Sequence, residues 1–261
     1  MGLDQYQITK IEAVLKNALR HKFQNYKPEP AAMPFHTRLL GKDRMASFSF
    51  IHSLNTNFGT SIFEPVALVL ASSKFKTAKS QVKVGNQISE KAQFEIQRIM
   101  DELKASKVKP DKLKETEIIR NVSQAGTLRE VKPTIADIWL ESHDGEYFLF
   151  DIKTAKPNKG GFIEFKRTIL EWTAIFLVEK PNAKVNTIIA IPYNPYDPKP
   201  YSRWTIAGML DVENELKVAE EFWDFLGGQG TYIDLLDCFE RVGIELRREI
   251  DDYFTKYNKS K

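Results

Sequence analysis

The sequence predicts an α/β fold in which a mixed central β-sheet is flanked by helices, with an N-terminal helical portion. Residues 135–154 contain two apolar segments around a polar turn with Asp144-Gly145, which is the pattern of a β-hairpin. A long helical pattern follows at 162–179, and the isoleucine-rich run at 186–191 is typical of a buried strand. A strand, a helix and a strand in this order indicate a right-handed crossover between parallel strands. The sheet should therefore join an antiparallel hairpin to a parallel pair.

The other elements are predicted from the spacing of apolar residues. Helical periodicity indicates further helices at 7–23, 57–72, 88–103, 212–226 and 235–257. A short strand is predicted at 81–84, a linker or extended arm with three prolines at 26–34, an exposed lysine-rich loop at 106–114, and a loop rich in prolines and aromatic residues at 193–204. These elements predict a single domain, 1–261, made of a helical arm (1–56), a core (57–192), and a loop with C-terminal helices (193–261).

The helix predicted within 57–72 contains an acid in an unusual place. Thr60 or Ser61 would cap this helix, and Pro65 would then be tolerated in its first turn. Glu64 would lie at the opening of a mostly buried helix. It either stabilises the helix dipole or contributes to a site.

Composition limits the class of protein. The 261 residues are 42% hydrophobic and 28% charged, as in ordinary folded domains. No run approaches the roughly 18 apolar residues of a membrane span, and the N-terminus does not resemble a signal peptide. The single cysteine, Cys238, excludes an internal disulfide and a multi-cysteine zinc site. A cytoplasmic location and no membrane partner are therefore expected, while a net charge of +3 neither requires nor excludes nucleic acid.

Three charged residues interrupt the apolar hairpin: Asp137 in its first strand, and Asp151 and Lys153 in its second. Because side chains alternate along a strand, residues 147, 149, 151 and 153 share one face, and the apolar residues 148, 150 and 152 take the other, the predicted core face. Charges inside an apolar strand are costly unless they are paired or bind a ligand. The hairpin is therefore the predicted functional region.

The register of the hairpin decides whether these three side chains can share a site. Pairing Asp137 with Asp151 centres the turn on Asp144 and leaves an odd number of loop residues. A two-residue turn at Asp144-Gly145 would pair Asp137 with Ile152 and turn its carboxylate to the other face. A shared site therefore predicts a three- or five-residue loop, or a bulge.

Two aspartates and a lysine on adjoining strands suit phosphodiester hydrolysis. The carboxylates of Asp137 and Asp151 are hard oxygen ligands for Mg²⁺, and Glu64 and the carbonyl of Ile152 are further candidate ligands. Lys153 would position or activate the attacking water, or compensate phosphate charge. The bare pattern also occurs by chance, in which case Asp151 and Lys153 form an ordinary salt bridge.

Several segments resemble known nucleases. Ala-Asp-Ile-Trp followed by Phe-Asp-Ile-Lys resembles the PD-(D/E)xK signature, with Ala136 in the place of the proline. The segments Pro-Phe-His-Thr-Arg-Leu-Leu (34–40), Phe-Gly-Thr-Ser-Ile-Phe-Glu-Pro-Val-Ala (58–67) and Asp-Ile-Lys-Thr-Ala-Lys-Pro-Asn (151–158) look like those of the TdeIII-type family of type II restriction endonucleases. The resemblance extends from about residue 34 to residue 204.

The resemblance implies a restriction-endonuclease-like core and a Mg²⁺-dependent homodimer that cuts double-stranded DNA at a short palindrome of the GGNCC kind. By position in the motif it implies that Asp137 and Asp151 are metal ligands and that Lys153 is the catalytic lysine. Glu64 would be the additional acidic residue that is often found in such enzymes.

Two loops carry the candidate DNA contacts. The first precedes a helix and would cradle phosphate, although an ordinary solvated loop fits as well; its residues are Lys156, Asn158 and Lys159. The second would read purine edges in the major groove or else pack its own aromatic residues; its polar residues are Asn194, Lys199 and Arg203.

Two other functions are compatible with the sequence. A structure-selective repair or junction-resolving nuclease would use the same core but prefer branched DNA over a sequence. A non-catalytic DNA-binding module would keep Asp137, Asp151 and Lys153 only as a buried ion-pair network. Such a module would bind without cleavage under any divalent ion.

Overall fold

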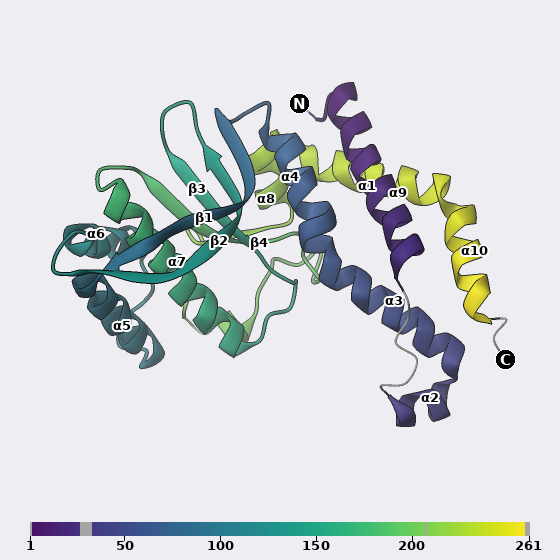
Figure 1. Ribbon diagram of the computed structural model, residues 1–261, viewed down its shortest axis with the longest axis horizontal. Helices are drawn as coiled ribbons and strands as arrows, with labels where there is room; N and C mark the ends of the chain where they lie inside the picture. The colour runs from purple at the N-terminus through teal and green to yellow at the C-terminus, as the bar shows by residue number, and fades with distance from the viewer. Residues whose placement is uncertain (1, 27–32, 207, 259–261) are drawn as a thin grey trace. The chain divides into compact units, whose positions relative to one another are not determined.

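The computed structural model describes residues 2–26, 33–206 and 208–258 (Figure 1). They form two compact units, the first made of Met1–Val69 with Gln229–Lys261 and the second of Leu70–Gly228. Residues 27–32, most of the predicted proline-rich linker, lie outside the described part. The single-domain organisation stays a prediction. Among the described residues, no helix has both the length and the apolarity to cross a membrane.

The first unit is helical, which confirms the predicted N-terminal helical portion. Its first helix begins with a capping box, in which Asp4 accepts from the N–H of Gln7 and the Gln7 side chain accepts from the N–H of Asp4. Its elements are α1 (Gln5–Asn25), α2 (Pro34–Leu40), α3 (Lys42–Phe58), a π-helical turn (Gly59–Phe63), most of α4 (Glu64–Ala71), α9 (Thr231–Glu245) and α10 (Arg247–Asn258).

The segment before α4 differs from the prediction. The chain is already helical through α3, so neither Thr60 nor Ser61 caps a new helix, and the π-helical turn carries the helix on into α4. The N–H of Glu64 bonds to the carbonyl of Gly59, the i→i−5 bond of a π-turn, directly before Pro65. Proline lacks an N–H, and a π-turn is one way in which a helix accommodates the missing bond.

The second unit contains a mixed five-stranded sheet of order β1-β2-β3-β4-β5, as the sequence predicts. β2 is antiparallel to both of its neighbours, β1 and β3, and β4 is parallel to both of its neighbours, β3 and β5. The strands are β1 (Thr77–Ser89), β2 (Leu128–Glu141), β3 (Tyr147–Ile152), β4 (Val185–Ile191) and β5 (Leu216–Val218); the helices are α5 (Glu90–Lys104), α6 (Lys112–Val122), the crossover helix α7 (Lys159–Glu179) and α8 (Glu220–Gly227). The predicted crossover and parallel pair are confirmed.

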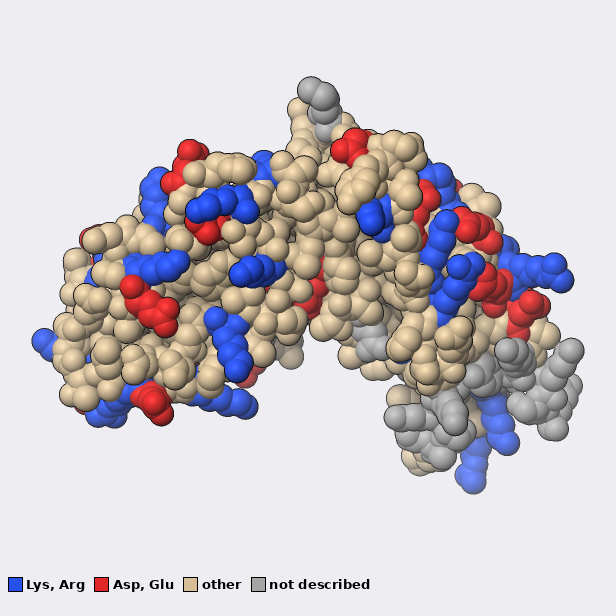
Figure 2. Space-filling view, turned by 45° about the horizontal axis from the view of Figure 1, so that its top comes forward, with Lys and Arg blue, Asp and Glu red and all other residues tan. Residues whose placement is uncertain are grey.

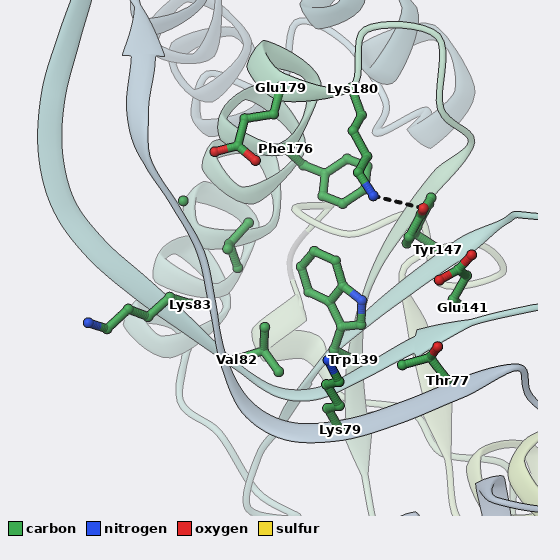
Figure 3. Close-up of a pocket in the computed structure, with 12 residues that line it drawn as sticks. Thr77, Lys79, Val82, Lys83, Trp139, Glu141, Tyr147, Phe176, Glu179 and Lys180 are labelled. Atoms are coloured by element: carbon green, nitrogen blue, oxygen red, sulfur yellow. Dashed lines mark hydrogen bonds between the residues drawn. The ribbon is translucent and has the colours of Figure 1, made fainter.

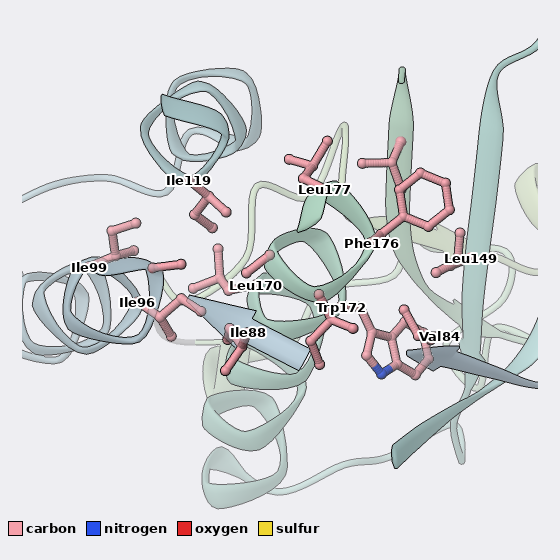
Figure 4. Close-up of a cluster of buried hydrophobic side chains, with 14 of the residues drawn as sticks. Val84, Ile88, Ile96, Ile99, Ile119, Leu149, Leu170, Trp172, Phe176 and Leu177 are labelled. Atoms are coloured by element: carbon pink, nitrogen blue, oxygen red, sulfur yellow. The ribbon is translucent and has the colours of Figure 1, made fainter. Parts of the chain in front are cut away.

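Both faces of β3 are covered, whereas the sequence predicts only one core face. On one side, Tyr147 contacts the ring of Phe176 in α7, and Leu149 is fully buried. On the other side, Phe148 and Phe150 pack against Phe225 of α8. The core on the α7 side continues into α5 and α6 (Figure 4); its labelled members are Val84, Ile88, Ile96, Ile99, Ile119, Leu149, Leu170, Trp172, Phe176 and Leu177. β3 is thus fixed by packing on both of its faces.

Four predicted elements have other bounds. The short strand at 81–84 is part of the 13-residue β1, an edge strand that pairs only with β2 and tolerates polar residues. Residues 216–218 of the predicted helix 212–226 form β5, and only the later part is helix α8. The predicted helix 235–257 is α9 and α10, which pack against α1 and α3 respectively. The loop predicted at 106–114 ends where α6 begins, and Lys112 is buried.

Candidate active site

The hairpin has the register that a shared site requires. Ile138 lies opposite Phe150 and Glu141 opposite Tyr147, which leaves five loop residues, 142–146. The loop closes through the N–H of Ser142, which donates to the carbonyl of Glu146 at 2.8 Å. The odd loop length is confirmed. One step beyond the last ladder pair, the same register places residue 137 opposite residue 151.

Two neighbouring strands hold the carboxylate of Asp137. Its Oδ2 accepts from the backbone N–H of Ile152 on β3 at 2.7 Å. Its Oδ1 accepts from Nε2 of Gln81 on β1 at 3.3 Å. The carboxylate therefore lies between β1 and β3 and turns toward the end of β3.

Asp151 and Lys153 form an ion pair at the end of β3. The Lys153 Nζ lies 2.5 Å from the Asp151 Oδ1 and 5.3 Å from the ring centroid of Phe165 in α7. Burial raises the pKa of Asp151 to about 6; Lys153 lowers this pKa, and the neighbouring Asp137 raises it. The structure thus brings together the three residues that the hairpin pattern predicts.

This donor set fits a divalent metal ion. Two carboxylates side by side repel each other unless a proton or a cation lies between them, and the raised pKa of Asp151 reflects this in part. In the described part of the chain, no group of three or more His, Cys, Asp or Glu side chains is arranged to hold a metal ion. Asp137, Asp151 and the carbonyl of Ile152 would hold an ion such as Mg²⁺, which keeps several waters.

Glu64 lies in the first unit, near the start of α4, and is 3% exposed. An acid buried this deeply needs a partner, and Glu64 does take part in a polar interaction. Its part in the site stays a prediction.

The two predicted DNA-contact loops lie against each other in the second unit. Tyr201 donates its hydroxyl to the carbonyl of Ala155 at 3.1 Å, and Lys156 Nζ lies 5.7 Å from the ring centroid of Tyr196. Burial raises the pKa of Tyr201 to about 12. The first loop follows Lys153 directly, so the two loops form one surface beside the ion pair.

Some of the predicted contact residues in these loops form hydrogen bonds within the protein, and others have exposed side chains. Asn158 caps α7 by accepting from the N–H of Gly161 at 2.7 Å. Asn194 and Arg203 bind within their own loop, Asn194 through both ends of its amide and Arg203 through the Tyr196 hydroxyl. The remaining three predicted contacts are lysines with exposed side chains: Lys156, Lys159 and Lys199.

Charge alone does not mark a DNA-binding surface. On the face shown in Figure 2, basic side chains are mixed with acidic ones, in keeping with a net charge of only +3. The position of a DNA-binding surface is therefore better predicted from the exposed lysines in the loops that follow Lys153 than from overall charge.

A cavity of about 400 Å³ lies on the α7 side of the sheet (Figure 3). Trp139, Tyr147 and Phe176 form its aromatic wall, and the Lys180 Nζ donates to the Tyr147 hydroxyl at 2.8 Å. Trp139 follows Asp137 by two residues on β2, so both side chains point to the same side of the strand. The cavity is distinct from the carboxylate pair.

The end of β3 and the part of β2 that faces it bring together two carboxylates and a lysine, the groups expected of a phosphodiester hydrolase. Comparison with known proteins agrees: the family described as type II restriction endonuclease, HinfI, matches residues 3–243. The type II restriction enzyme HgiCII of Herpetosiphon aurantiacus is 27% identical over 83% of this chain and 80% of its own length. MjaII of Methanocaldococcus jannaschii is 27% identical over 98% of this chain and 76% of its own length.

The chain belongs to the HinfI family of type II restriction endonucleases. These enzymes are site-specific deoxyribonucleases that act on double-stranded DNA and generally use divalent metal ions. The expected enzyme class is confirmed. The narrower TdeIII-type and PD-(D/E)xK assignments stay predictions.

Proposed function

We propose that this protein is a Mg²⁺-dependent endonuclease that cuts both strands of DNA at a short palindromic site. The observation that carries the proposal is the convergence of Asp137, on β2, with Asp151 and Lys153 at the end of β3. A buried acid whose pKa is raised by burial and by a second carboxylate is typical of functional sites.

Each residue has a separate role in this proposal. Asp137 and Asp151, with the carbonyl of Ile152, would hold the metal, and the backbone N–H of Ile152 orients Asp137. The metal, when bound, neutralises phosphate charge and makes water a better nucleophile. Lys153 orients the attacking water or compensates charge on the phosphate. Lys156 and Lys159 bind the DNA backbone, which positions the duplex without reading its sequence. Lys199, in the second loop, is proposed to contact base edges in the major groove.

A palindromic target implies a two-fold dimer, because protein symmetry mirrors site symmetry. The GGNCC-like site and the TdeIII-type assignment belong to the same proposal and rest on the quoted motifs. A homodimer in the cytoplasm is the expected form.

A digest of a large, fully sequenced, unmethylated DNA tests the function directly. We expect discrete fragments with Mg²⁺ and none with a chelator, and the sequenced ends will give the recognition site. A smear, or a preference for branched DNA, would favour the repair or junction-resolving nuclease instead. Intact DNA under every divalent ion would favour a binding module with an ion pair at Asp151 and Lys153.

The predicted role of Glu64, as an additional acidic residue of the metal site, is tested by a single substitution. We expect Glu64→Gln to slow cleavage by about 10- to 100-fold, the usual loss for a residue that supports a metal site. Glu90→Gln, which alters an exposed first-turn acid of α5, is the matched control and should leave cleavage unchanged. Equal rates for the two variants at all Mg²⁺ concentrations would remove Glu64 from the site.

A further inference from the structure

Gln81 has a backbone conformation that its residue type does not favour. It lies within β1 with φ of 53°, in the left-handed region, and it is not a glycine. Residues other than glycine avoid this region because Cβ approaches the following carbonyl oxygen. Such strain persists where the surrounding structure fixes it, and it concentrates at functional sites.

The position of Gln81 connects this conformation to the candidate active site. Ser80 pairs with Ile138 and Val82 with Ala136, so Gln81 lies directly opposite Asp137. The Gln81 Nε2 donates to the Asp137 Oδ1 at 3.3 Å, while the Asp137 Oδ2 accepts from the N–H of Ile152. The two oxygens of one carboxylate are thus held by donors from two different strands.

We infer that Gln81 is a positioning residue, whose strained backbone keeps its side-chain amide on Asp137 so that this carboxylate is oriented before metal and DNA bind. An amide suits this role because it donates a hydrogen bond without adding charge beside the two acids. A glutamate here would add a third negative charge, and a lysine would neutralise the carboxylate that must attract the metal.

The inference rests on the proposed function, and Gln81→Gly separates positioning from folding. Glycine adopts a positive φ without strain, so we expect the melting temperature without metal to be unchanged or raised by up to about 3 °C. Cleavage should fall by roughly 10- to 100-fold, because small misplacements of a reacting group cost this much. Weaker metal binding should also raise the half-saturating Mg²⁺ concentration and reduce the Mg²⁺-induced rise in melting temperature. KM for DNA should stay unchanged.

Two further variants distinguish the side chain from the backbone. Ser106→Gly is the matched control, since Ser106 also has φ of 53° but is exposed between α5 and α6, away from Asp137. Ser106→Gly should have a melting temperature similar to that of Gln81→Gly and should cleave DNA at the full parent rate. Gln81→Asn introduces a residue that tolerates positive φ and retains an amide, but on a side chain too short to reach Asp137 in the same way. It should therefore lose activity as Gln81→Gly does.

The outcomes separate this inference from the proposed function. Cleavage by Gln81→Gly within about twofold of the parent rate would overturn the positioning role, as would a melting temperature below that of the parent, since the side chain would then be holding the strand. If Asp151→Ala abolishes cleavage but Gln81→Gly does not, only the role of Gln81 is wrong. If Asp151→Ala cleaves normally, the proposed site itself is wrong.

Discussion

Asp151→Asn should lower the rate of DNA cleavage on the order of 10³-fold or more, while DNA binding without metal is largely kept. The substitution preserves the size of the side chain but removes the charge that is proposed to hold the metal, and metal stabilisation of a transition state contributes several kcal/mol. The rate is measured by single-turnover cleavage and the affinity by a metal-free binding titration. The matched control is Asp144→Asn in the exposed hairpin loop, which should cleave at the parent rate.

The same substitution should stabilise the metal-free protein at pH 8. Burial and Asp137 raise the folded-state pKa of Asp151 from 3.8 to about 6, so its stabilising contribution is present below pH 3.8 and is lost as the pH rises through 6. Above that pH the ionised carboxylate is a net cost, which asparagine removes. We expect a gain on the order of 1–3 kcal/mol in unfolding free energy at pH 8.

Two observations would contradict this account of Asp151. One is a variant that is less stable than the parent at pH 8 without metal, because burial would then not penalise the carboxylate. The other is a variant that gains as much thermal stability from Mg²⁺ as the parent does, because its metal site would then be intact. Urea unfolding at pH 4 and pH 8, with and without Mg²⁺, distinguishes these cases.

The hairpin site was predictable because chemistry and geometry constrain each other there. Asp137 can meet Asp151 only if the loop length is odd, and the five-residue loop confirms this. The crossover helix and β4 were predictable because their apolar patterns are long or unbroken. The same local signals place Lys153 beside Asp151 without any long-range information.

Other features depend on contacts between distant parts of the chain. β5 has only three residues, and Leu216 becomes a strand residue by pairing with Ile189, which overrides a weak helical pattern. Gln81 has no sequence signal, because its positive φ and its contact with Asp137 are set by pairing with β2. Most of β1 was not predicted, because this edge strand contains many polar residues and lacks a continuous apolar pattern.

The least predictable feature is a buried charge cluster that joins α6, α7 and the segment before β5. Lys166 has no exposed surface, and its Nζ lies 2.5 Å from Glu115 and 2.7 Å from Glu215. Burial raises the pKa of Glu115, and it lowers the pKa of the adjacent Lys112 to about 8. Lys166 and Glu215 lie in ordinary helical patterns and Lys112 lies in the loop predicted at 106–114, so only tertiary structure brings them together.

Lys166→Met should therefore cost about 3–5 kcal/mol of unfolding free energy, because it leaves two buried carboxylates without their shared cation. Lys184→Met is the matched control: Lys184 also lies 2.5 Å from its partner, Glu146, but its side chain is 77% exposed. Surface pairs of this kind contribute little, so the control should change stability by less than about 1 kcal/mol. Urea unfolding at pH 8 measures both variants.

The pH dependence and a second substitution identify the cause of the loss. Without Lys166, which lowers the raised pKa of Glu115, this pKa should rise further, so the deficit should shrink as the pH falls from 8 to 5 and the Glu115 carboxylate takes up a proton. Adding Glu215→Gln to Lys166→Met should recover part of the stability, since one uncompensated charge is removed. A deficit that is independent of pH and unchanged in the double variant would assign the loss to packing of the lysine stem instead.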